Sequence, residues 1–439
     1  MARPNETNML LKLKKIFTTD LVKVSLLNAL ATLVRMLTAF VSGKVVANLI
    51  GPSGFALLGQ LNNFSQILLT FSAGGINTGM TKHIAEYSDS EKRYRLFLST
   101  GLRITALLSF ICSLVLIFGA GYFSRTILKS AEYTYVFYIF GATIMLYAFN
   151  AMLVAVLNGF REFKKYVSVN IISSLTGLLF SIILAYNFYL PGALIAAVTY
   201  QSVVVIVTLV MVTSSKWFAW RLFFAGFSKT ALIKLSRFAL MTIVSVVCIN
   251  TSQLIVRAYI ADNAGNHLVD AGLWEGVNRI STMYLQVITT SLSVYYLPKL
   301  AGLKSNNEVR NEIISVYKLV VPFLLFTSLT IFLCRGTIIN ILFNDQFQDM
   351  QGLFAFQLMG DFFKMITWVL GYVLLAKAMA RTFIVVEIIS CSLFALLSVF
   401  FINLYGTIGA TIGYACSFFI QFIIMLFVLR KILFSYERK

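Results

Sequence analysis

Residues 271–303 combine charged and amide side chains with enough length to cross a lipid bilayer, for which about 20 helical residues suffice. Glu275 and Arg279 lie four residues apart, so on a helix they share one face and are close enough to pair. Steps of three or four residues extend this face through Thr282, Gln286, Thr289 and Ser293. Because lipid cannot satisfy such groups, we expect the polar face to line a wet central pathway.

Five cations occur deep within apolar segments of the sequence: Arg35, Lys44, Arg257, Arg279 and Lys364. Each costs about 3 kcal/mol at the centre of a bilayer, which makes lipid exposure unfavourable. Glu275 and Asp361 are the acids at comparable depth. We predict that Glu275 pairs with Arg279 and that Asp361 pairs with Lys364, which leaves three cations in excess. The four cations other than Lys44, together with Asp361, are predicted to point into one shared cavity.

Amide and aromatic side chains lie on the same helices as these charges, and Gln60 and Asn63 share a face of the uncharged segment 55–81. The candidate binding residues of this kind are Gln60, Asn63, Asn250, Gln253, Asn278, Gln286, Gln357 and Trp368. Arginine binds phosphate oxygens in a forked, charge-assisted geometry, while amides pair with hydroxyl groups and an indole offers a flat face to a sugar ring. The sequence therefore predicts a cavity for a ligand that has both phosphate and sugar parts.

Motifs for nucleotide-driven or hydrolytic chemistry are absent from the sequence. Residues 302–305, GLKS, end like a phosphate-binding loop but lack its first glycine, and neither HExxH nor GxSxG occurs. The five cysteines lie singly without CxxC spacing, and the two histidines are far apart. We therefore expect a protein that is not an enzyme and that holds no metal or cofactor.

The composition is that of a polytopic membrane protein. Hydrophobic residues make up 59% of the chain and charged residues 12%, whereas a soluble domain has about 25% charged residues. Twelve apolar segments are predicted to be transmembrane helices, at 22–50, 55–81, 97–121, 133–157, 167–188, 190–213, 238–261, 271–298, 314–334, 351–376, 383–403 and 406–429. The expected fold is all-α.

The net charge of +19 follows the expected membrane topology and does not indicate a nucleic-acid partner. If the N-terminus is cytoplasmic, the cytoplasmic segments carry 26 of the 36 Lys and Arg residues. The opposite loops carry only Arg125, Lys129 and Arg335. Because positive charge favours the cytoplasmic side, both termini are predicted to be cytoplasmic.

The chain is predicted to form two six-helix lobes, 1–213 and 235–439, around a central cavity. The segment between them, 214–234, mixes aromatic and basic residues, and over 214–230 its composition is typical of a helix lying in the membrane interface. A weak repeat supports the division, because 57–67 aligns with 273–283 at an offset of 216 residues.

Four stretches resemble the Wzx-type flippases of lipid-linked oligosaccharides, which belong to the multidrug/oligosaccharidyl-lipid/polysaccharide exporter superfamily. They are 272–303, 353–377 (LFAFQLMGDFFKMITWVLGYVLLAK), 73–87 (AGGINTGMTKHIAEY) and 158–161 (NGFR). The resemblance is greatest to the flippases for O-antigen units and enterobacterial common antigen. It implies a MATE-like fold and a cationic lumen.

The resemblance also implies a substrate and a location. The substrate would be an undecaprenyl-diphosphate-linked oligosaccharide, moved from the cytoplasmic to the periplasmic leaflet of the bacterial inner membrane by alternating access. Arg279 and Lys364 would attract the diphosphate, amides would bind the sugars, and Glu275 and Asp361 would hold the cations. Membrane lipids, a polysaccharide polymerase and other assembly proteins are the expected partners.

Two other classes of function remain open from the residues. A drug or metabolite exporter of the same fold is expected to bind cations, so its pocket would be acidic or apolar. A non-transporting scaffold within a polysaccharide assembly complex would need no polar stripes.

Overall fold

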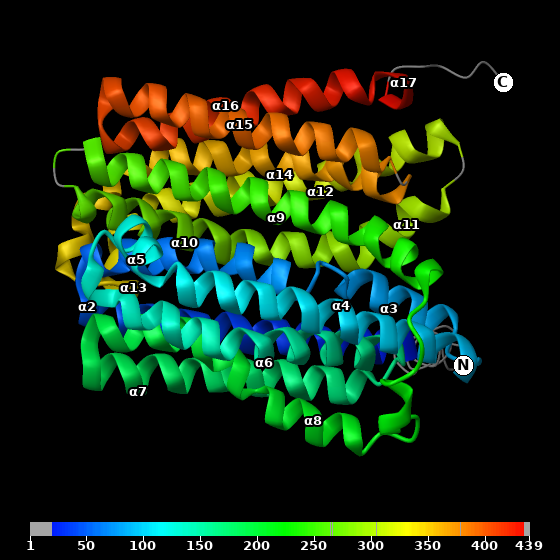
Figure 1. Cartoon of the computed structure of the whole chain (residues 1–439). Helices are drawn as coiled ribbons and strands as arrows, with labels where there is room; N and C mark the ends of the chain where they lie inside the picture. The colour runs from blue at the N-terminus through cyan, green and yellow to red at the C-terminus, as the bar shows by residue number, and fades with distance from the viewer. Residues whose placement is uncertain (1–19, 264, 266, 304, 378, 434–439) are drawn as a thin grey trace, which may run out of the picture.

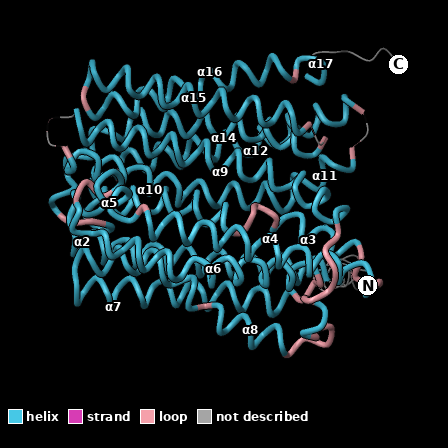
Figure 2. The backbone as a smooth tube through the Cα atoms, in the orientation of Figure 1, coloured by secondary structure: helices cyan, strands magenta, loops and turns pink. Residues whose placement is uncertain are grey.

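The computed structural model describes residues 20–433 except 264, 266, 304 and 378. Helices joined by short loops make up almost all of this part of the chain, and no strand occurs in it (Figure 2). The all-α prediction is therefore confirmed. The basic residues before 20 and after 433, which contribute to the predicted topology, lie outside the described residues.

The first half of the chain forms one group of helices. Its elements are α2 (Asp20–Ser72), α3 (Asn77–Glu86), α4 (Glu91–Phe118), α5 (Ala120–Ile127), the 3-10 turn η1 (Ala131–Tyr133), α6 (Thr134–Gly159), α7 (Phe163–Val203) and α8 (Val205–Thr213). A connecting segment containing the 3-10 turn η2 (Trp220–Leu222) then leads into the second half.

The second half begins with α9 (Lys229–Asn263) and α10 (Leu268–Ser291). The remaining elements are the π-helix η3 (Leu292–Tyr296), α11 (Leu297–Gly302), α12 (Asn306–Leu333), α13 (Arg335–Leu342), η4 (Asp345–Leu353), α14 (Phe354–Ala376), α15 (Ala380–Tyr405), α16 (Thr407–Val428) and α17 (Arg430–Leu433).

Two long helices reverse direction close to a proline. In α2, Gly51 has a φ of 65° and precedes Pro52, so the helix bends where a residue without a Cβ is best tolerated. In α7, Tyr189 has a φ of 51° and lies two residues before Pro191. Within the described ranges, nine helices are long and apolar enough to cross a membrane, and two of them, 44 and 51 residues long, contain these bends. The count of twelve spans stays a prediction.

The predicted continuous helix over 55–81 is interrupted in the structure. Helix α2 ends at Ser72 and α3 begins at Asn77, with Gly74 and Gly75 between them at φ values of 68° and 60°. A Cβ on Gly75 would lie 3.0 Å from the carbonyl oxygen of Ala239 on α9. The prediction of one helix is wrong here because the backbone turns at two glycines where it approaches α9 closely.

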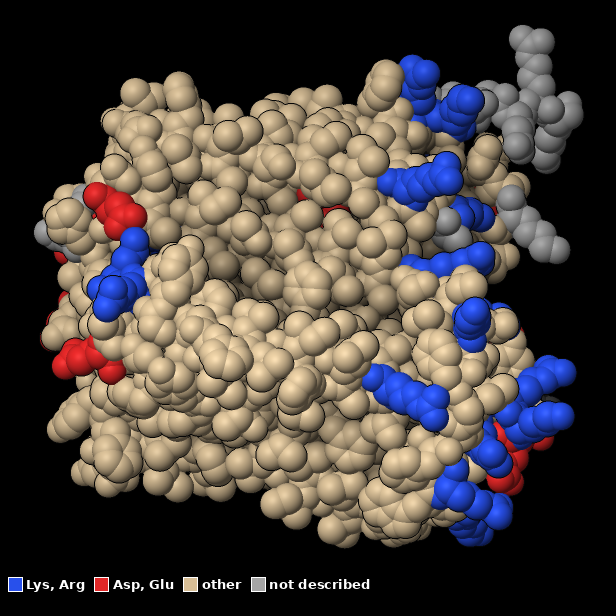
Figure 3. All heavy atoms as spheres, viewed as in Figure 1, with Lys and Arg blue, Asp and Glu red and all other residues tan. Residues whose placement is uncertain are grey.

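The helices run along one common direction in two groups (Figure 1). Most of α2–α8 lies in the lower part of the view and most of α9–α17 in the upper part, and α2 contacts α9 and α10 where the groups meet. The described chain begins and ends at the right-hand end. Most of the Lys and Arg side chains on this face of the molecule gather at the same end (Figure 3), which we call the basic end.

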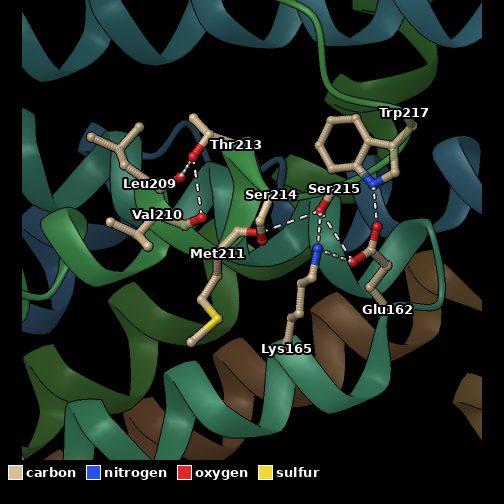
Figure 4. Close-up of polar contacts among 9 residues, drawn as sticks. All are labelled: Glu162, Lys165, Leu209, Val210, Met211, Thr213, Ser214, Ser215 and Trp217. Carbon is tan, nitrogen blue, oxygen red and sulfur yellow. Dashed lines mark hydrogen bonds and ion pairs between the residues drawn. The ribbon is translucent and has the colours of Figure 1, made fainter.

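The segment between α8 and α9 is bound to the first half of the chain and is not helical over most of its length. Trp217 stacks on Phe160 with ring centroids 4.2 Å apart. The indole Nε1–H of Trp217 donates a 2.7 Å hydrogen bond to Glu162 Oε1 (Figure 4). Lys165 Nζ lies 2.8 Å from Glu162 Oε2 and donates to Ser215 Oγ at 2.7 Å.

These contacts place side chains of the connecting segment against α6 and α7. The prediction of an interfacial helix over 214–230 is therefore wrong, because only Trp220–Leu222 form a helical turn before α9 begins at Lys229. The aromatic composition that favoured a helix also serves to pack this loop, since Phe223 is 4% exposed and belongs to the core of the first half.

Candidate functional site

A cavity of about 660 Å³ lies between α2, α7 and α10. Arg35 on α2 and Arg279 on α10 are the charged residues of its wall. The remaining polar wall comes mainly from the first half of the chain and includes Asn62, Asn158, Asn170, Tyr200 and Gln201. The cavity therefore combines two guanidinium groups with neutral hydrogen-bonding groups, as the sequence predicts for a ligand with phosphate and sugar parts.

A second cavity of about 590 Å³ adjoins the first between α3, α6 and α7. The two share part of their walls, formed by Asn158, Tyr166, Asn170, Ser173 and Gln201. We call the first the central cavity and the second the side cavity.

Most of this polar wall was not predicted from the sequence. On α7, Tyr166, Asn170, Ser173, Gly177 and Ser181 follow one another at steps of three or four residues and all line the central cavity. This spacing is as regular as that of the predicted stripes. The prediction relied mainly on charged residues to find pathway-lining helices, and α7 carries no charge on this face.

Arg279 faces the central cavity without pairing with Glu275. Its guanidinium lies over the ring of Phe55, 5.2 Å from the centroid. The predicted Glu275–Arg279 ion pair is wrong, because the carboxylate of Glu275 instead pairs with Arg257 on the neighbouring helix α9. The ion pairs of the described residues do not include Arg279, so its charge is available to a ligand.

Arg257 belongs to a buried network that joins the two halves of the chain. It is 3% exposed, it pairs with Glu275, and its Nη1 donates a 3.1 Å hydrogen bond to Gln60 Oε1 on α2. Gln60 Nε2 in turn donates to the carbonyl of Leu254 at 3.3 Å. The two terminal nitrogens of the guanidinium thus have a carboxylate and an amide partner, while its Nε has no hydrogen-bond partner in the described structure. Arg257 therefore connects helices and does not line the central cavity, contrary to the prediction.

The two repeat-like stretches of the sequence meet at this network. Gly59 lies so close to Glu275 that a Cβ would come within 2.6 Å of the carboxylate carbon. Phe55 on the same helix lies beneath Arg279. The contact between 57–67 and 273–283 thus holds Glu275 away from the cavity and leaves Arg279 facing it.

Asp361 is also buried outside the central cavity. It is 0% exposed, and the hydroxyl groups of Tyr284 and Tyr414 each donate a 2.8 Å hydrogen bond to its carboxylate. Lys364 lies instead among aromatic rings, with Nζ 5.7 Å from the Trp368 centroid and 5.4 Å from that of Phe418. The predicted Asp361–Lys364 ion pair is absent from the described residues, because tyrosine hydroxyls take the place of the ammonium group.

The remaining predicted amide and aromatic residues pair with protein groups or lie apart from both cavities. Gln357 is 1% exposed and donates to Asn278 Oδ1 at 3.3 Å and to Ser281 Oγ at 3.2 Å, while Asn250 donates to the carbonyl of Val246 at 2.8 Å. Neither cavity is lined by Asn63, Gln253, Gln286 or Trp368. Of the fourteen predicted binding residues, only Arg35 and Arg279 line the central cavity, and the prediction of one shared cavity is wrong for Arg257, Asp361 and Lys364.

The end of the molecule opposite the basic end is closely packed. Helix α10 crosses the bend of α2 so tightly that a Cβ on Gly272 would overlap the carbonyl oxygen of Pro52. Phe55 makes edge-on contacts with Phe343 and Phe347, each at 5.9 Å between centroids. Lys129 and Asp262 join the two halves by an ion pair of 3.0 Å.

This architecture is that of the MATE-like transporters. A multidrug resistance MATE family transporter of the MOP superfamily, in an inward-facing conformation, superposes with a TM-score of 0.77 at 14% identity, over 91% of this chain and 96% of that one. A MOP superfamily transporter from Pyrococcus furiosus, described as having a binding pocket of reversed polarity, superposes with a TM-score of 0.66 at 14% identity, over 94% and 96% of the two chains. The chain therefore has a MATE-like fold, with nine helices in its described residues that are long and apolar enough to cross a membrane.

Residues 21–304 match the family described as "Polysaccharide biosynthesis protein", so the chain belongs to that family. The Lipid III flippases of Escherichia coli (strain K12) and Shigella flexneri are each 29% identical to it over 407 residues. These alignments cover 92% of this chain and 96% of each flippase. The resemblance to oligosaccharide flippases of the MOP superfamily is thus confirmed.

Proposed function

We propose that this protein flips an undecaprenyl-diphosphate-linked oligosaccharide from the cytoplasmic to the periplasmic leaflet of the bacterial inner membrane. The oligosaccharide would be a repeat unit for a surface polysaccharide, either O-antigen or enterobacterial common antigen. The main support for this proposal is the central cavity, in which Arg35 and Arg279 face a wall of amides and hydroxyl groups. Two unneutralised guanidinium groups match the two phosphates of the carrier lipid, and the neutral wall matches its sugars.

The mechanism that we propose is alternating access by two lobes, residues 1–213 and 235–439, with 214–234 as connector. The basic end would face the cytoplasm, as positive charge favours, and both termini would lie there. In the described conformation, packing at the opposite end would close the periplasmic side. Transport would then require Gly272 to separate from Pro52 and the Lys129–Asp262 ion pair to break.

The buried charged groups have a supporting role in this proposal. Glu275 and Asp361 hold neighbouring helices through Arg257 and two tyrosines, so they position the cavity wall without contacting the ligand. Lys364 and Trp368 lie beyond the central cavity and remain candidates for a second conformation of the transporter. A polysaccharide polymerase and other assembly proteins are the proposed partners that receive the flipped lipid.

An exporter of cationic drugs is the second candidate on grounds of fold alone. The central cavity argues against it, because its charged wall residues are both cations and would repel such a ligand. A non-transporting scaffold would not require a polar cavity within the membrane.

The test is complementation in bacteria that lack their own oligosaccharide flippase, assayed against several defined repeat units. We expect surface polysaccharide to return for at least one of them, and we expect Arg279→Ala to abolish the rescue. The control is Arg125→Ala, which removes an exposed arginine distant in sequence from the cavity wall. Failure to rescue any repeat unit at normal protein levels would exclude the proposed function.

A further inference from the structure

The side cavity differs chemically from the central cavity. Residues that line only the side cavity include Asn77, Thr81, Lys82, Tyr147 and Asn150. Lys82 is the one charged residue in its wall, and neither Arg35 nor Arg279 belongs to it. Its volume of about 590 Å³ lies within the range of about 300–1,000 Å³ that small-ligand pockets occupy. The wall thus offers hydrogen bonds with little charge.

Two asparagines of this wall have unused hydrogen-bonding capacity. Asn150 is 8% exposed, and its Oδ1 has no hydrogen-bond partner within the described structure. Its Nδ2 makes only a 3.5 Å contact with the carbonyl of Gln201. The Oδ1 of Asn77 likewise has no partner there. Unsatisfied amide groups in an interior are unfavourable, so a ligand that supplies donors and acceptors to them gains affinity.

The side cavity also offers flat aromatic surface at its junction with the central cavity. Tyr147 lines the side cavity, and Tyr166 lines both cavities. A sugar ring has hydroxyl groups around its edge and C–H groups on its faces, so it fits a wall that combines amides with tyrosine rings. A second phosphate fits this wall less well than the central cavity, because its one cation is Lys82, whose ammonium group lies over the ring of Phe238, whereas the central cavity offers two guanidinium groups.

From these observations we infer that the side cavity is a glycan subsite for uncharged, hydroxyl- and acetamido-bearing sugars. It adjoins the central cavity, where the diphosphate would bind between Arg35 and Arg279. This assignment rests on the proposed function, and it places the recognition of the sugars in the first half of the chain. The diphosphate contacts, by contrast, come from both halves, since Arg35 belongs to α2 and Arg279 to α10.

The division predicts that the two parts of the ligand can be tested separately. The full-length protein in nanodiscs would be titrated with undecaprenyl diphosphate and with the same lipid carrying a neutral trisaccharide of hexose and N-acetylhexosamine. We expect the trisaccharide to tighten binding by about tenfold, which corresponds to one or two net hydrogen bonds. The double variant Asn77→Ala with Asn150→Ala should lose this gain while its Kd for the bare lipid stays unchanged.

Two controls fix the interpretation. Asn187→Ala with Asn263→Ala removes two exposed asparagines, each bonded to a backbone carbonyl of its own helix, and should bind both lipids normally. Arg279→Ala should weaken both lipids by the same factor, because it acts on the diphosphate. The Kd of the double variant for bare lipid also reports whether the variant is folded.

Each remaining outcome identifies which idea is wrong. If the Asn77→Ala, Asn150→Ala variant keeps the full gain from the trisaccharide, or if it binds the bare lipid more weakly than the unmodified protein does, the glycan subsite is excluded and the proposed function stands. If the unmodified protein binds neither lipid, the proposed function itself is excluded, and the glycan subsite with it.

Discussion

Glu275 on α10 pairs with Arg257 on α9 although Arg279 lies only one turn away on its own helix. The partner of Glu275 is thus supplied by a neighbouring helix, and Gln60 from α2 completes the network. One consequence is that Arg279 keeps an unneutralised charge at the central cavity. A second consequence is that the two halves of the chain are joined by polar contacts inside the membrane-spanning region.

Arg279 is expected to be essential for transport. Arg279→Ala should reduce flipping by roughly tenfold or more, because a charge-assisted, forked contact with phosphate is lost. Arg279→Lys should restore part of the activity, since the charge remains without the fork. The measurement is the amount of lipid-linked oligosaccharide retained in the cytoplasmic leaflet at matched protein levels. Normal flipping by Arg279→Ala would remove this residue from the proposed binding site.

Arg257 is expected to matter for stability more than for ligand binding. Arg257→Gln would leave the Glu275 carboxylate unpaired in the interior, at a cost of about 3–5 kcal/mol. The double variant Arg257→Gln with Glu275→Gln should recover most of this loss, because no uncompensated charge remains. Thermal unfolding of the purified variants measures both effects. Equal destabilisation by the single and double variants would mean that charge pairing is not what the network contributes.

Gly272 is expected to control closure at the end opposite the basic end. In a background without cysteines, Lys129→Cys and Asp262→Cys replace a pair whose charged atoms are 3.0 Å apart, so a short crosslinker should join them. Gly272→Ala should lower the crosslinking yield severalfold, because the added methyl group cannot fit beside Pro52. Gly371→Ala is the matched control, since a Cβ there meets nothing within 4 Å. A yield unaffected by Gly272→Ala would show that this contact does not hold the end closed.

The membrane orientation can be measured with single cysteines in the same background. Lys216→Cys lies in the connecting segment and is predicted to react only with reagents that reach the cytoplasm, whereas Lys129→Cys should be labelled from the periplasm. Both positions are accessible enough for labelling, since Lys216 is exposed and the Lys129 side chain is 35% exposed. Periplasmic labelling at position 216 would reverse the proposed topology.

The sequence predicts the fold well because the membrane imposes strong local rules. Apolar length identifies the helices, and the Gly51–Pro52 and Leu190–Pro191 turns mark two reversals. The interruption at Gly74 and Gly75 was missed, because glycine is common in membrane helices and only its contact with α9 explains the turn.

The site was predicted less completely, for a physical reason that its ion pairs illustrate. Spacing along one helix can show that Glu275 is able to reach Arg279, but it cannot show that Arg257 competes for the same carboxylate. In the same way, the spacing of Asp361 and Lys364 along one helix could not show that tyrosines of α10 and α16 bind the Asp361 carboxylate. The polar stripe of α7, in contrast, was readable from Tyr166, Asn170 and Ser173 and was overlooked because it carries no charge.

The segment that connects the two halves is fixed to the first half, which limits how far the halves can move apart. Fifteen residues, 214–228, could span about 50 Å if fully extended. The chain is instead fixed along its path: Trp217 is bound at Glu162, the carbonyl of Ala225 accepts hydrogen bonds from Ser99 and Arg103, and the backbone of Ser228 donates to Thr100. In this conformation the connecting segment therefore has no unused length, and it has already lost the conformational entropy of a flexible loop. A rocking motion of the two halves would have to bend the first turns of α9 or break these hydrogen bonds. The connector is therefore a short, fixed link between the halves and not a flexible one.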